Sequence, residues 1–161
     1  MNLPENYQIV NERGIYGFFK QYRFLSNFHP CDLIIGDIHY PSSEHAFMAY
    51  KTDNIGEKIR LSGIVKPSDV KKAGQLVTLR PDWEYYRVAA MLSCLYAKFA
   101  PDTELADMLL ETGGKYLEET NWWHDQFWGF YKPQPGIEVF GGTGGLNMLG
   151  KCLMIVRNSL K

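Results

Sequence analysis

The sequence has few cysteines and no long apolar run. Its three cysteines, Cys31, Cys94 and Cys152, are odd in number and far apart, which is typical of reduced thiols in a cytosolic protein and argues against a disulfide framework. No window approaches the roughly 18 consecutive apolar residues of a membrane-spanning helix. Residues 1–10 lack the basic start and apolar run of a secretory signal. We therefore expect a cytoplasmic protein that makes no contact with a membrane.

Charge of one sign and metal-ligand spacing are also lacking. With 17 Lys and Arg against 18 Asp and Glu, the formal net charge is -1, so the chain as a whole does not attract a phosphate backbone. Any nucleic-acid contact must come from a local patch. His29, Cys31, His39 and His45 follow no recognised ligand spacing. The sequence therefore predicts neither a metal site nor a cofactor, and no feature of it predicts a protein partner.

Aromatic residues, by contrast, are abundant. The chain holds 4 Trp, 10 Tyr and 9 Phe among 161 residues, a length that fits one domain. Its hydrophobic fraction of 45% and charged fraction of 22% are ordinary for a soluble globular protein. Flat side chains with polar edges stack well on sugars and bases, and they equally well fill an aromatic-rich core. Composition leaves both interpretations open.

The first part of the chain carries strand patterns. Residues 1–14 are polar, and we interpret them as a loose lead-in with little core. Apolar stretches at 15–19 and 31–40 indicate strands. Gly36-Asp37 predicts a tight reversal within the second stretch. We therefore expect a small β element before the first helix.

Helical patterns follow. Pro41 is expected to end the β element, and Ser42 or Ser43 to cap a helix over 44–53 through its hydroxyl. Prolines that can open a helix predict further helices at 67–75, at 81–100, and between Pro101 and Gly113. Apolar residues at helical spacing support these helices, and the last helix is predicted at 146–160. The fold class is thus mainly α with a small β element (α+β). We predict a single compact domain over residues 15–161.

Glu44 and Lys51 would share one face of the helix predicted over 44–53. They stand seven residues apart, so their Cα atoms would lie about 10 Å apart along the axis. A stabilising ion pair prefers a spacing of three or four residues, so a plain helix salt bridge fits this pair poorly. For Glu44 alone a structural role is equally open, because an acid in the first turn complements the helix dipole.

Two other segments combine polar side chains with hydrophobic or aromatic ones. Ser26 and Asn27 lie between hydrophobic residues, where they suit either a hydroxylated ligand or a capped turn. Residues 121–129 bring three Trp, one Phe, an imidazole, a carboxylate and two amides into nine positions. Such a run exceeds what a connecting loop needs and favours the lining of a nucleoside or sugar site. The long loops expected at 115–131 and 133–145 are more often functional than idle.

A glycine-rich stretch precedes the last predicted helix. Residues 141–145, Gly-Gly-Thr-Gly-Gly, would offer backbone N–H groups and a helix N-terminus to a phosphate. The stretch lacks the Gly-Lys-Ser/Thr ending of a P-loop and differs from the dinucleotide fingerprint. A flexible hinge explains these glycines equally well.

Several short motifs occur in an order and spacing that resemble the NADAR family, small domains typified by the YbiA-like proteins and linked to ADP-ribose and NAD metabolism. The resemblance covers about residues 15–161. Its motifs are Phe24-Leu25-Ser26-Asn27-Phe28, Pro41-Ser42-Ser43-Glu44-His45, Ala49-Tyr50-Lys51, Leu79-Arg80-Pro81-Asp82-Trp83, Ala97-Lys98-Phe99, Glu119-Thr120-Asn121, Asp125 with Trp128-Gly129, and Gly145-Leu146-Asn147-Met148-Leu149-Gly150.

The resemblance implies cleavage of an N-glycosidic bond between ribose and a base-like group. Two substrate classes go with the family: ADP-ribose attached to guanine in nucleic acid, and ribosylamino-pyrimidine intermediates of riboflavin synthesis. Carried over by position, Glu44 is the acid–base residue, and Lys51 attacks the anomeric carbon of ribose through a Schiff base. The residues implied to bind or orient the substrate are Ser26, Asn27, Phe28, His45, Arg80, Trp83, Asn121, Trp128, Gly129 and Asn147.

Asp125 is a third catalytic candidate under this resemblance. It either orients a ribose hydroxyl or Lys51, or it forms a carboxylate pair with Glu44, as in two-carboxylate glycosidases. One departure from the family is Gly74-Gln75, where many relatives have Gly-Arg. A charged contact is therefore lost, or it is moved to one of three nearby cations, Lys71, Lys72 or Arg80.

Our preferred hypothesis is removal of ADP-ribose from guanine in nucleic acid, because the aromatic excess suits a base together with ADP-ribose. One alternative is hydrolysis of ribosylamino-pyrimidine riboflavin intermediates. Another is a non-catalytic module that binds ADP-ribose or a nucleotide, although simple binding does not need both Glu44 and Lys51. The expected partner is accordingly an ADP-ribosylated guanine nucleic acid or a small ribosylated metabolite.

Overall fold

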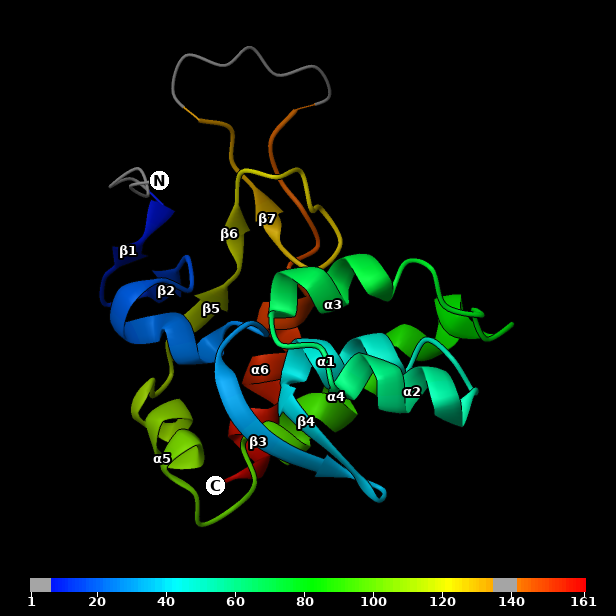
Figure 1. Cartoon of the computed structure of the whole chain (residues 1–161). Helices are drawn as coiled ribbons and strands as arrows, with labels where there is room; N and C mark the ends of the chain where they lie inside the picture. The colour runs from blue at the N-terminus through cyan, green and yellow to red at the C-terminus, as the bar shows by residue number, and fades with distance from the viewer. Residues whose placement is uncertain (1–6, 135–141) are drawn as a thin grey trace. The chain divides into compact units, whose positions relative to one another are not determined.

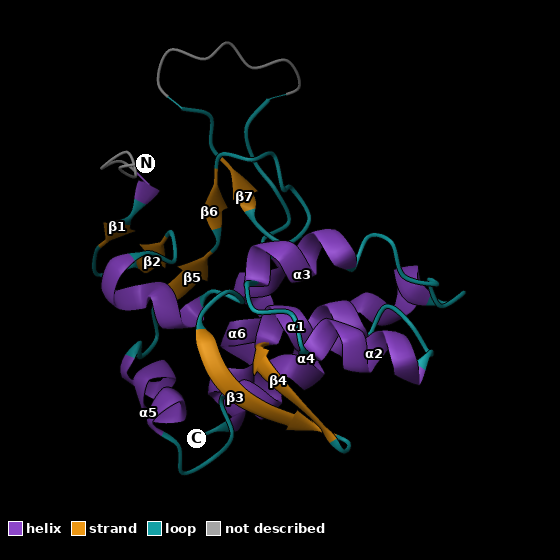
Figure 2. Cartoon of the chain, viewed as in Figure 1, coloured by secondary structure: helices purple, strands orange, loops and turns teal. Residues whose placement is uncertain are grey.

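Helices make up most of the regular structure in the computed structural model, which describes residues 7–134 and 142–161 (Figure 2). Within these residues the strands are short and form one three-stranded and two two-stranded sheets. The predicted mainly α fold with a small β element (α+β) is confirmed. The chain forms two compact units: unit 1 comprises Met1–Ser26 and Met108–Lys161, and unit 2 comprises Asn27–Asp107.

The predicted reversal at Gly36-Asp37 is present in unit 2. β3 (Pro30–Ile35) and β4 (Ile38–Ser42) pair antiparallel on either side of it. Gly36 has a φ of 60°, a left-handed conformation that glycine adopts without strain. Pro41 does not end the β element as expected, because β4 continues to Ser42. The hairpin tolerates the missing N–H of Pro41, since each strand has only one neighbour and the register shifts in this part of the pairing.

The helix predicted over 44–53 is shorter in the structure. α1 (Ser43–Ala49) ends four residues earlier than predicted. It starts one residue earlier than predicted, and the predicted serine cap is present, because the Ser42 side chain accepts a hydrogen bond from the His45 N–H. Every residue of α1 is buried, and the helix contacts both strands of the hairpin and the other three helices of unit 2 (Figure 1). α1 is therefore the central element of this unit.

The sequence does not predict α2 (Ile55–Ser62), the next helix. Its start carries a recognisable signal: the Asn54 side chain accepts from the Glu57 N–H, and the two residues have the spacing of a capping box. The apolar pattern hides the helix, however. Ile55 and Ile59 are exposed, and Leu61 is the one buried residue of α2. Apolar side chains on the outer face blur the periodicity on which helix prediction depends.

α3 (Pro67–Ala73) and α4 (Trp83–Lys98) confirm the next two predicted helices with shorter ends. Gly74 follows α3 at the point where this helix meets α1, and an added Cβ atom would lie 2.4 Å from the Met48 Sδ. Close packing of α1 and α3 therefore requires glycine at this position. The buried residues on and just after α4 are Trp83, Ala90, Met91, Cys94, Leu95, Lys98 and Phe99.

A three-stranded sheet opens unit 1. β2 (Gly14–Tyr16) lies between β1 (Ile9–Val10), which is antiparallel to it, and β5 (Tyr116–Glu118), which is parallel. The strand predicted over 15–19 therefore starts one residue early and ends three residues early. Gly17, which follows it, has a φ of 84°, outside the extended region. The 3-10 helix η2 (Lys20–Leu25) comes next.

The lead-in predicted over 1–14 is more ordered than expected from residue 7 onward, while residues 1–6 lie outside the described part of the chain. Tyr7 is only 2% exposed, and its ring packs edge-on against Trp122 at 4.7 Å. β1 adds main-chain hydrogen bonds to the sheet. The polar sequence conceals this order because a single buried aromatic residue anchors it.

The stretch predicted as a loop over 115–131 contains short strands. β6 (Thr120–Asn121) and β7 (Phe130–Tyr131) pair in parallel. Strands of two residues are too short to show the alternation by which a strand is recognised in a sequence. The loop predicted over 133–145 falls largely on residues 135–141, outside the described part of the chain.

Two further helices confirm the predictions for the end of the chain. α5 (Glu104–Glu111) begins after Pro101 as expected, and the chain passes from unit 2 into unit 1 within it. α6 (Met148–Ser159) packs against β5. Over residues 7–134 and 142–161, no helix is long and apolar enough to cross a membrane.

Candidate functional site

The first turn of α1 holds Glu44 in place. The backbone N–H of Glu44 donates to the Asn27 carbonyl at 3.0 Å, and the Ser43 hydroxyl lies 3.3 Å from that oxygen and 3.3 Å from Oδ1 of the same residue. The Asn27 amide in turn donates to the Met91 Sδ at 3.4 Å. Glu44 itself is 5% exposed. Asn27, predicted to bind substrate, thus has hydrogen bonds that position the acid–base candidate.

His45 is bonded to the protein through both ring nitrogens. Its Nδ1 lies 2.7 Å from the Ser42 hydroxyl, and its Nε2 lies 2.8 Å from the Ile64 carbonyl. Because a carbonyl can only accept, Nε2 carries the proton and Nδ1 accepts from the serine. Burial lowers the pKa of His45, which favours this neutral form. These contacts leave neither ring nitrogen for the substrate-binding role that the family resemblance implies.

Lys51 lies beyond the end of α1, so the continuous helix assumed for Glu44 and Lys51 is wrong. The Lys51 N–H donates to the Met48 carbonyl at 3.2 Å in a final turn. Its Nζ lies 6.0 Å from the centroid of the Trp83 ring, and that ring packs against Phe47 at 5.3 Å. The amine therefore stands beside an aromatic wall at the start of α4.

Electrostatics connect Lys51 with Glu44. Burial lowers the pKa of the Lys51 ammonium, and the Glu44 carboxylate opposes this effect without cancelling it. The pKa of Lys51 is therefore below its ordinary value. A larger fraction of the amine is then neutral, which is the form that attacks an electrophilic carbon. Unit 2 thus contains a buried carboxylate and, within its electrostatic influence, an amine with a lowered pKa.

Arg80 is engaged by carboxylates and an aromatic ring. Its Nε and Nη2 donate to the two oxygens of Asp82 at 2.6 and 3.0 Å, and Nη1 lies 3.8 Å from Asp53. The guanidinium carbon stands 3.8 Å from the centroid of the Tyr86 ring. The backbone N–H of Arg80 donates to the Lys51 carbonyl at 2.8 Å. A guanidinium already balanced by two carboxylates has a weakened attraction for a phosphate.

Phe28 and Lys71 lie together in unit 2. The Lys71 Nζ is 5.9 Å from the centroid of the Phe28 ring, within the range of a cation–π contact. Lys71 and Lys72 are both exposed on α3. Of the three cations considered as replacements for the family arginine at Gln75, Lys71 therefore lies beside Phe28, a predicted substrate-binding residue.

In unit 1, Asn121 and Asp125 lock one loop. The Asn121 amide donates to the Asp125 carbonyl at 2.7 Å, and its Oδ1 accepts from the Asp125 N–H at 3.0 Å. The Asp125 Oδ1 accepts from the N–H groups of Phe127 and Trp128 at 3.1 and 2.9 Å. Gly129 packs tightly behind them, since an added Cβ would lie 2.6 Å from the Asn121 Nδ2. These bonds shape the loop that presents Trp128.

The tryptophans of the segment 121–129 have different surroundings. Trp122 packs between Tyr7 and Phe19, with ring centroids 4.7 and 5.8 Å away. Trp123 touches Trp122 at 5.1 Å, and its residue surface is 46% exposed. Trp122 therefore contributes to the packing of unit 1, whereas Trp123 lies largely at the surface, and a stacking role for this segment stays a prediction.

Asn147 connects β5 with the start of α6. Its Oδ1 accepts from the Glu119 N–H at 3.1 Å, and its Nδ2 donates to the Tyr116 hydroxyl and the Leu117 carbonyl at 2.9 and 2.8 Å. The residue is buried and has a φ of 50°, a left-handed conformation that asparagine tolerates. Its hydrogen bonds are thus made within unit 1.

The N-terminus of α6 offers little to a phosphate. Backbone N–H groups at this end donate to main-chain carbonyls of the preceding loop. Leu146 donates to Gln126 and Asn147 to Gly129, while Met148 donates to Phe127 and Leu149 to Trp128. Gly144 exchanges two hydrogen bonds with Tyr131. Gly141, part of the glycine stretch, lies outside the described residues. The described glycines therefore support packing of the loop rather than anion binding.

The predicted site residues divide between the two units. Unit 2 brings together Asn27, Phe28, Glu44, His45, Lys51, Arg80 and Trp83. Unit 1 holds Ser26, Asn121, Asp125, Trp128, Gly129 and Asn147. Ser26 closes η2, where its N–H donates to the Arg23 carbonyl at 3.0 Å. Across the described residues, no group of three or more His, Cys, Asp and Glu side chains is arranged to hold a metal ion.

The family model of the NADAR domain matches residues 15–161. The chain belongs to the NADAR family. The N-glycosidase YbiA of Escherichia coli is 32% identical to it over 153 residues, covering 91% of this chain and 87% of YbiA. The NMR structure of E. coli YbiA superposes with a TM-score of 0.76, at 26% identity over 97% of this chain and 89% of that chain.

A second kind of relative is longer than this NADAR chain. A riboflavin biosynthesis protein of Vibrio vulnificus is 34% identical over 160 residues, which are 94% of this chain and 40% of that protein. By contrast, an N-glycosidase of Nostoc punctiforme has a length similar to that of this chain. It is 29% identical, with 91% of this chain and 90% of the relative covered. The names of these relatives support an N-glycosidase activity in the NADAR family.

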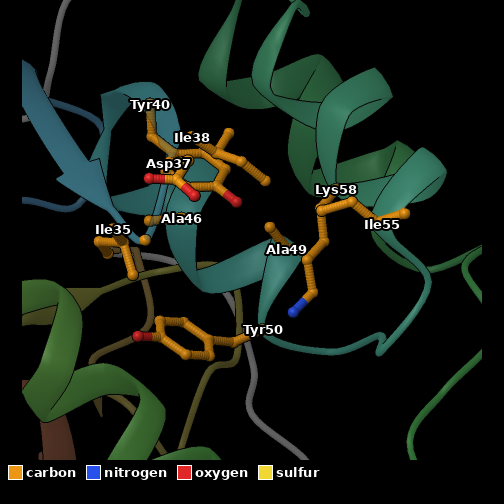
Figure 3. A pocket seen from close by; sticks show the side chains of 10 residues that line it. Ile35, Asp37, Ile38, Tyr40, Ala46, Ala49, Tyr50, Ile55 and Lys58 are labelled. Atoms are coloured by element: carbon orange, nitrogen blue, oxygen red, sulfur yellow. The ribbon is translucent and has the colours of Figure 1, made fainter.

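A pocket of about 280 Å³ lies on another face of α1 (Figure 3). It is lined by Ile35, Gly36, Asp37, Ile38, Tyr40, Ala46, Ala49, Tyr50, Ile55 and Lys58. Successive helical residues are about 100° apart, so Ala46 points away from the side of α1 that carries Glu44. Burial raises the pKa of Tyr40 to about 12, which keeps its hydroxyl neutral. The pocket contains neither Glu44 nor Lys51.

Lys98 is a buried charged residue to which the sequence analysis assigns no role. It is 2% exposed, and its Nζ lies 5.2 Å from the centroid of the Phe99 ring. Its charge lowers the pKa of the Cys31 thiol, although burial raises that pKa more strongly. The sequence does carry a pattern that predicts this burial. Lys98 follows Leu95 by three residues and Cys94 by four, which places it on the apolar face of α4.

Proposed function

We propose that this NADAR chain is an N-glycosidase that cleaves the bond between ribose C1 and a base-like nitrogen, with Glu44 and Lys51 as its reacting groups. The observation that carries the proposal is the shared environment of these two residues in unit 2. Glu44 is buried in the first turn of α1, and the amine of Lys51 stands beside Trp83 with a lowered pKa. Family membership supplies the reaction class.

The chemistry follows from the two groups. The Glu44 carboxyl group gives its proton to the departing nitrogen as the C1–N bond breaks. The neutral Lys51 amine adds to C1, one of its protons passes to the ring oxygen, and the C1–O bond of the ring breaks to leave a protonated Schiff base between Nζ and C1. The Glu44 carboxylate then removes a proton from water, which adds to C1. Loss of the amine releases the ribose aldehyde and regenerates Lys51.

A carboxylate pair of Glu44 and Asp125 is the mechanistic alternative. Asp125 Oδ1 accepts hydrogen bonds from two backbone N–H groups. These bonds favour a role for Asp125 in shaping the loop that carries Trp128 over a role as a second catalytic carboxylate. Lysine participation is tested by borohydride, which reduces a Schiff base to a stable amine. The expected adduct on Lys51 is absent from Lys51→Arg. Turnover of the wild type without any adduct would instead support the carboxylate pair.

For the substrate, a small ribosylamino-pyrimidine intermediate of riboflavin synthesis is the first candidate. The names of the relatives from Vibrio vulnificus and Zea mays, both riboflavin biosynthesis proteins, favour it over our sequence-based preference. The cation beside Phe28, Lys71, suits the single phosphate of such a metabolite. ADP-ribose on guanine in nucleic acid is the second candidate. The exposed ring of Tyr85 favours it, because it suits stacking on a base of a larger substrate.

One assay separates these functions. The purified chain is incubated with ribosylamino-pyrimidine phosphate or with an ADP-ribosyl-guanine oligonucleotide, and the released base and sugar are quantified by mass spectrometry. Glu44→Gln is expected to lose activity by about 10²–10⁴-fold. Glu84→Gln is the matched control, since Glu84 is an exposed acid in the first turn of α4. Binding of either substrate without turnover would leave only the non-catalytic module.

A further inference from the structure

Glu57, in the first turn of α2, accepts hydrogen bonds from two separate segments of unit 2. The Thr52 hydroxyl donates to its Oε2 at 2.5 Å. The Thr78 N–H lies 3.1 Å from each carboxylate oxygen, and the Thr78 hydroxyl lies 3.3 Å from Oε1. This one side chain therefore joins the segment that follows α1 to the segment that precedes α4.

Both segments lead directly to Lys51. Thr52 is the next residue in the chain, is 0% exposed, and accepts the Asn54 N–H through its hydroxyl at 3.2 Å. Thr78 stands two residues before Arg80, whose N–H donates to the Lys51 carbonyl. The backbone of Lys51 is thus held from one side by Arg80 and from the other through Thr52 and the Glu57 carboxylate.

A role in helix capping does not account for this arrangement. In a capping box the acid three residues after the N-cap bonds back to the N-cap N–H. Here the N-cap is Asn54, and its N–H bonds to Thr52 instead. The helix dipole alone would require a nearby negative charge but no particular donors. The contacts of Glu57 are directed away from α2 and toward the neighbours of Lys51.

We propose that Glu57 is a positioning residue for Lys51, which holds the segment 50–54 so that the Lys51 amine stays half-buried beside Trp83. The inference rests on the proposed role of Lys51. Loss of the Glu57 carboxylate frees Thr52 and Thr78, so the segment loosens and the amine moves into water. In water the amine is protonated at neutral pH and no longer attacks the sugar.

The test uses Glu57→Ala, with Asp69→Ala as the matched control, because Asp69 is an exposed acid in the first turn of α3. Amine acetylation is followed by peptide mass spectrometry as a function of pH. In the wild type Lys51 is expected to titrate below 10.5, the ordinary pKa of a lysine. In Glu57→Ala its midpoint is expected to move toward that value, and in Asp69→Ala it stays in place.

Activity supplies the second readout. Glu57→Ala is expected to reduce the rate of borohydride trapping and kcat by about tenfold or more, with a smaller change in KM. Glu57→Gln retains one acceptor oxygen and should fall between Glu57→Ala and the wild type. Thr52→Val removes the hydroxyl that donates to Glu57 and accepts the Asn54 N–H, and it tests the same link if Glu57→Ala does not fold.

The outcomes separate this inference from the proposed function. A lowered melting temperature with unchanged Lys51 titration and unchanged trapping per folded molecule would overturn the positioning role. If the wild type forms no adduct with either substrate, the proposed role of Lys51 fails. The acetylation profile then still decides whether Glu57 positions the lysine, because it requires no turnover.

Discussion

The carbonyl oxygen of Lys51 accepts a hydrogen bond from the N–H of Arg80 at 2.8 Å. This bond joins the candidate nucleophile to the segment that starts α4, where Trp83 forms the wall beside the amine. The Arg80 side chain is fixed in turn by Asp82 and Tyr86. The position of the lysine therefore depends on how Asp82 and Tyr86 hold the Arg80 guanidinium.

Arg80→Lys is expected to lower kcat by about three- to tenfold while leaving KM nearly unchanged. Lysine keeps the charge but loses the bidentate bond to Asp82 and the flat contact with Tyr86, so the Lys51 segment is held less firmly. Steady-state kinetics on the better substrate measure the effect. Arg87→Lys is the control, because Arg87 pairs with Glu84 on the outer face of α4. A large rise in KM with constant kcat would instead assign Arg80 to direct substrate binding.

Lys51→Met is expected to abolish adduct formation and to raise the melting temperature at pH 7 by about 1–3 °C. The pKa of Lys51 in the folded chain is lowered from its ordinary 10.5, so the unfolded chain binds more protons between the two values. Stability therefore rises with pH through this window, and burial of the ammonium costs stability below it. Removal of the amine removes this cost.

Calorimetry at pH 7 and at pH 10 measures this effect of Lys51→Met. The gain in melting temperature should shrink at the higher pH, where the amine of the folded wild type loses its proton. Lys72→Met, on the exposed face of α3, serves as the control and should change neither value. An equal gain at both pH values would mean that better packing, and not charge burial, explains the stabilisation.

Local backbone signals predicted unit 2 better than side-chain chemistry predicted its site. Gly36 marks the hairpin turn and Ser42 the cap of α1, because each acts through its own neighbours in the chain. The backbone beyond the end of α1 depends instead on contacts with distant residues. Thr52 is fixed through Glu57 to Thr78, and no local pattern reports that link.

The same distinction explains the site residues. The motifs indicate which polar side chains are candidates for the site, but they do not show which groups each side chain hydrogen-bonds. His45 and Asn147 occur in motifs of a binding family, yet their polar atoms bond within the protein. A sequence pattern cannot distinguish a polar residue that touches substrate from one that orients the site, since both are needed for activity.

His45→Ala is expected to destabilise the fold by about 2–4 kcal/mol without changing KM. The substitution removes two buried hydrogen bonds and leaves a cavity beside Ser42 and Ile64. Urea unfolding measures the stability, and kinetics at low temperature measure KM on the folded fraction. His39→Ala is the control, because His39 is an exposed residue of β4. A KM that rises several-fold with unchanged stability would restore the substrate-binding role of His45.

Glu118→Gln is expected to raise the melting temperature at pH 7 but not at pH 4. Burial raises the pKa of Glu118 above its ordinary 4.5, although the Thr120 hydroxyl and the Lys132 charge partly oppose this. The folded chain therefore binds more protons than the unfolded chain between the two pKa values, and stability falls as pH rises through the folded-state value. Glutamine avoids the buried charge and still accepts from Thr120.

Thermal unfolding between pH 4 and pH 7.5 follows this loss of stability in the wild type and its reduction in Glu118→Gln. Glu111→Gln, at the exposed end of α5, is the matched control and should follow the wild-type curve. Parallel curves for the wild type and Glu118→Gln would show that the ionised carboxylate costs nothing where it lies.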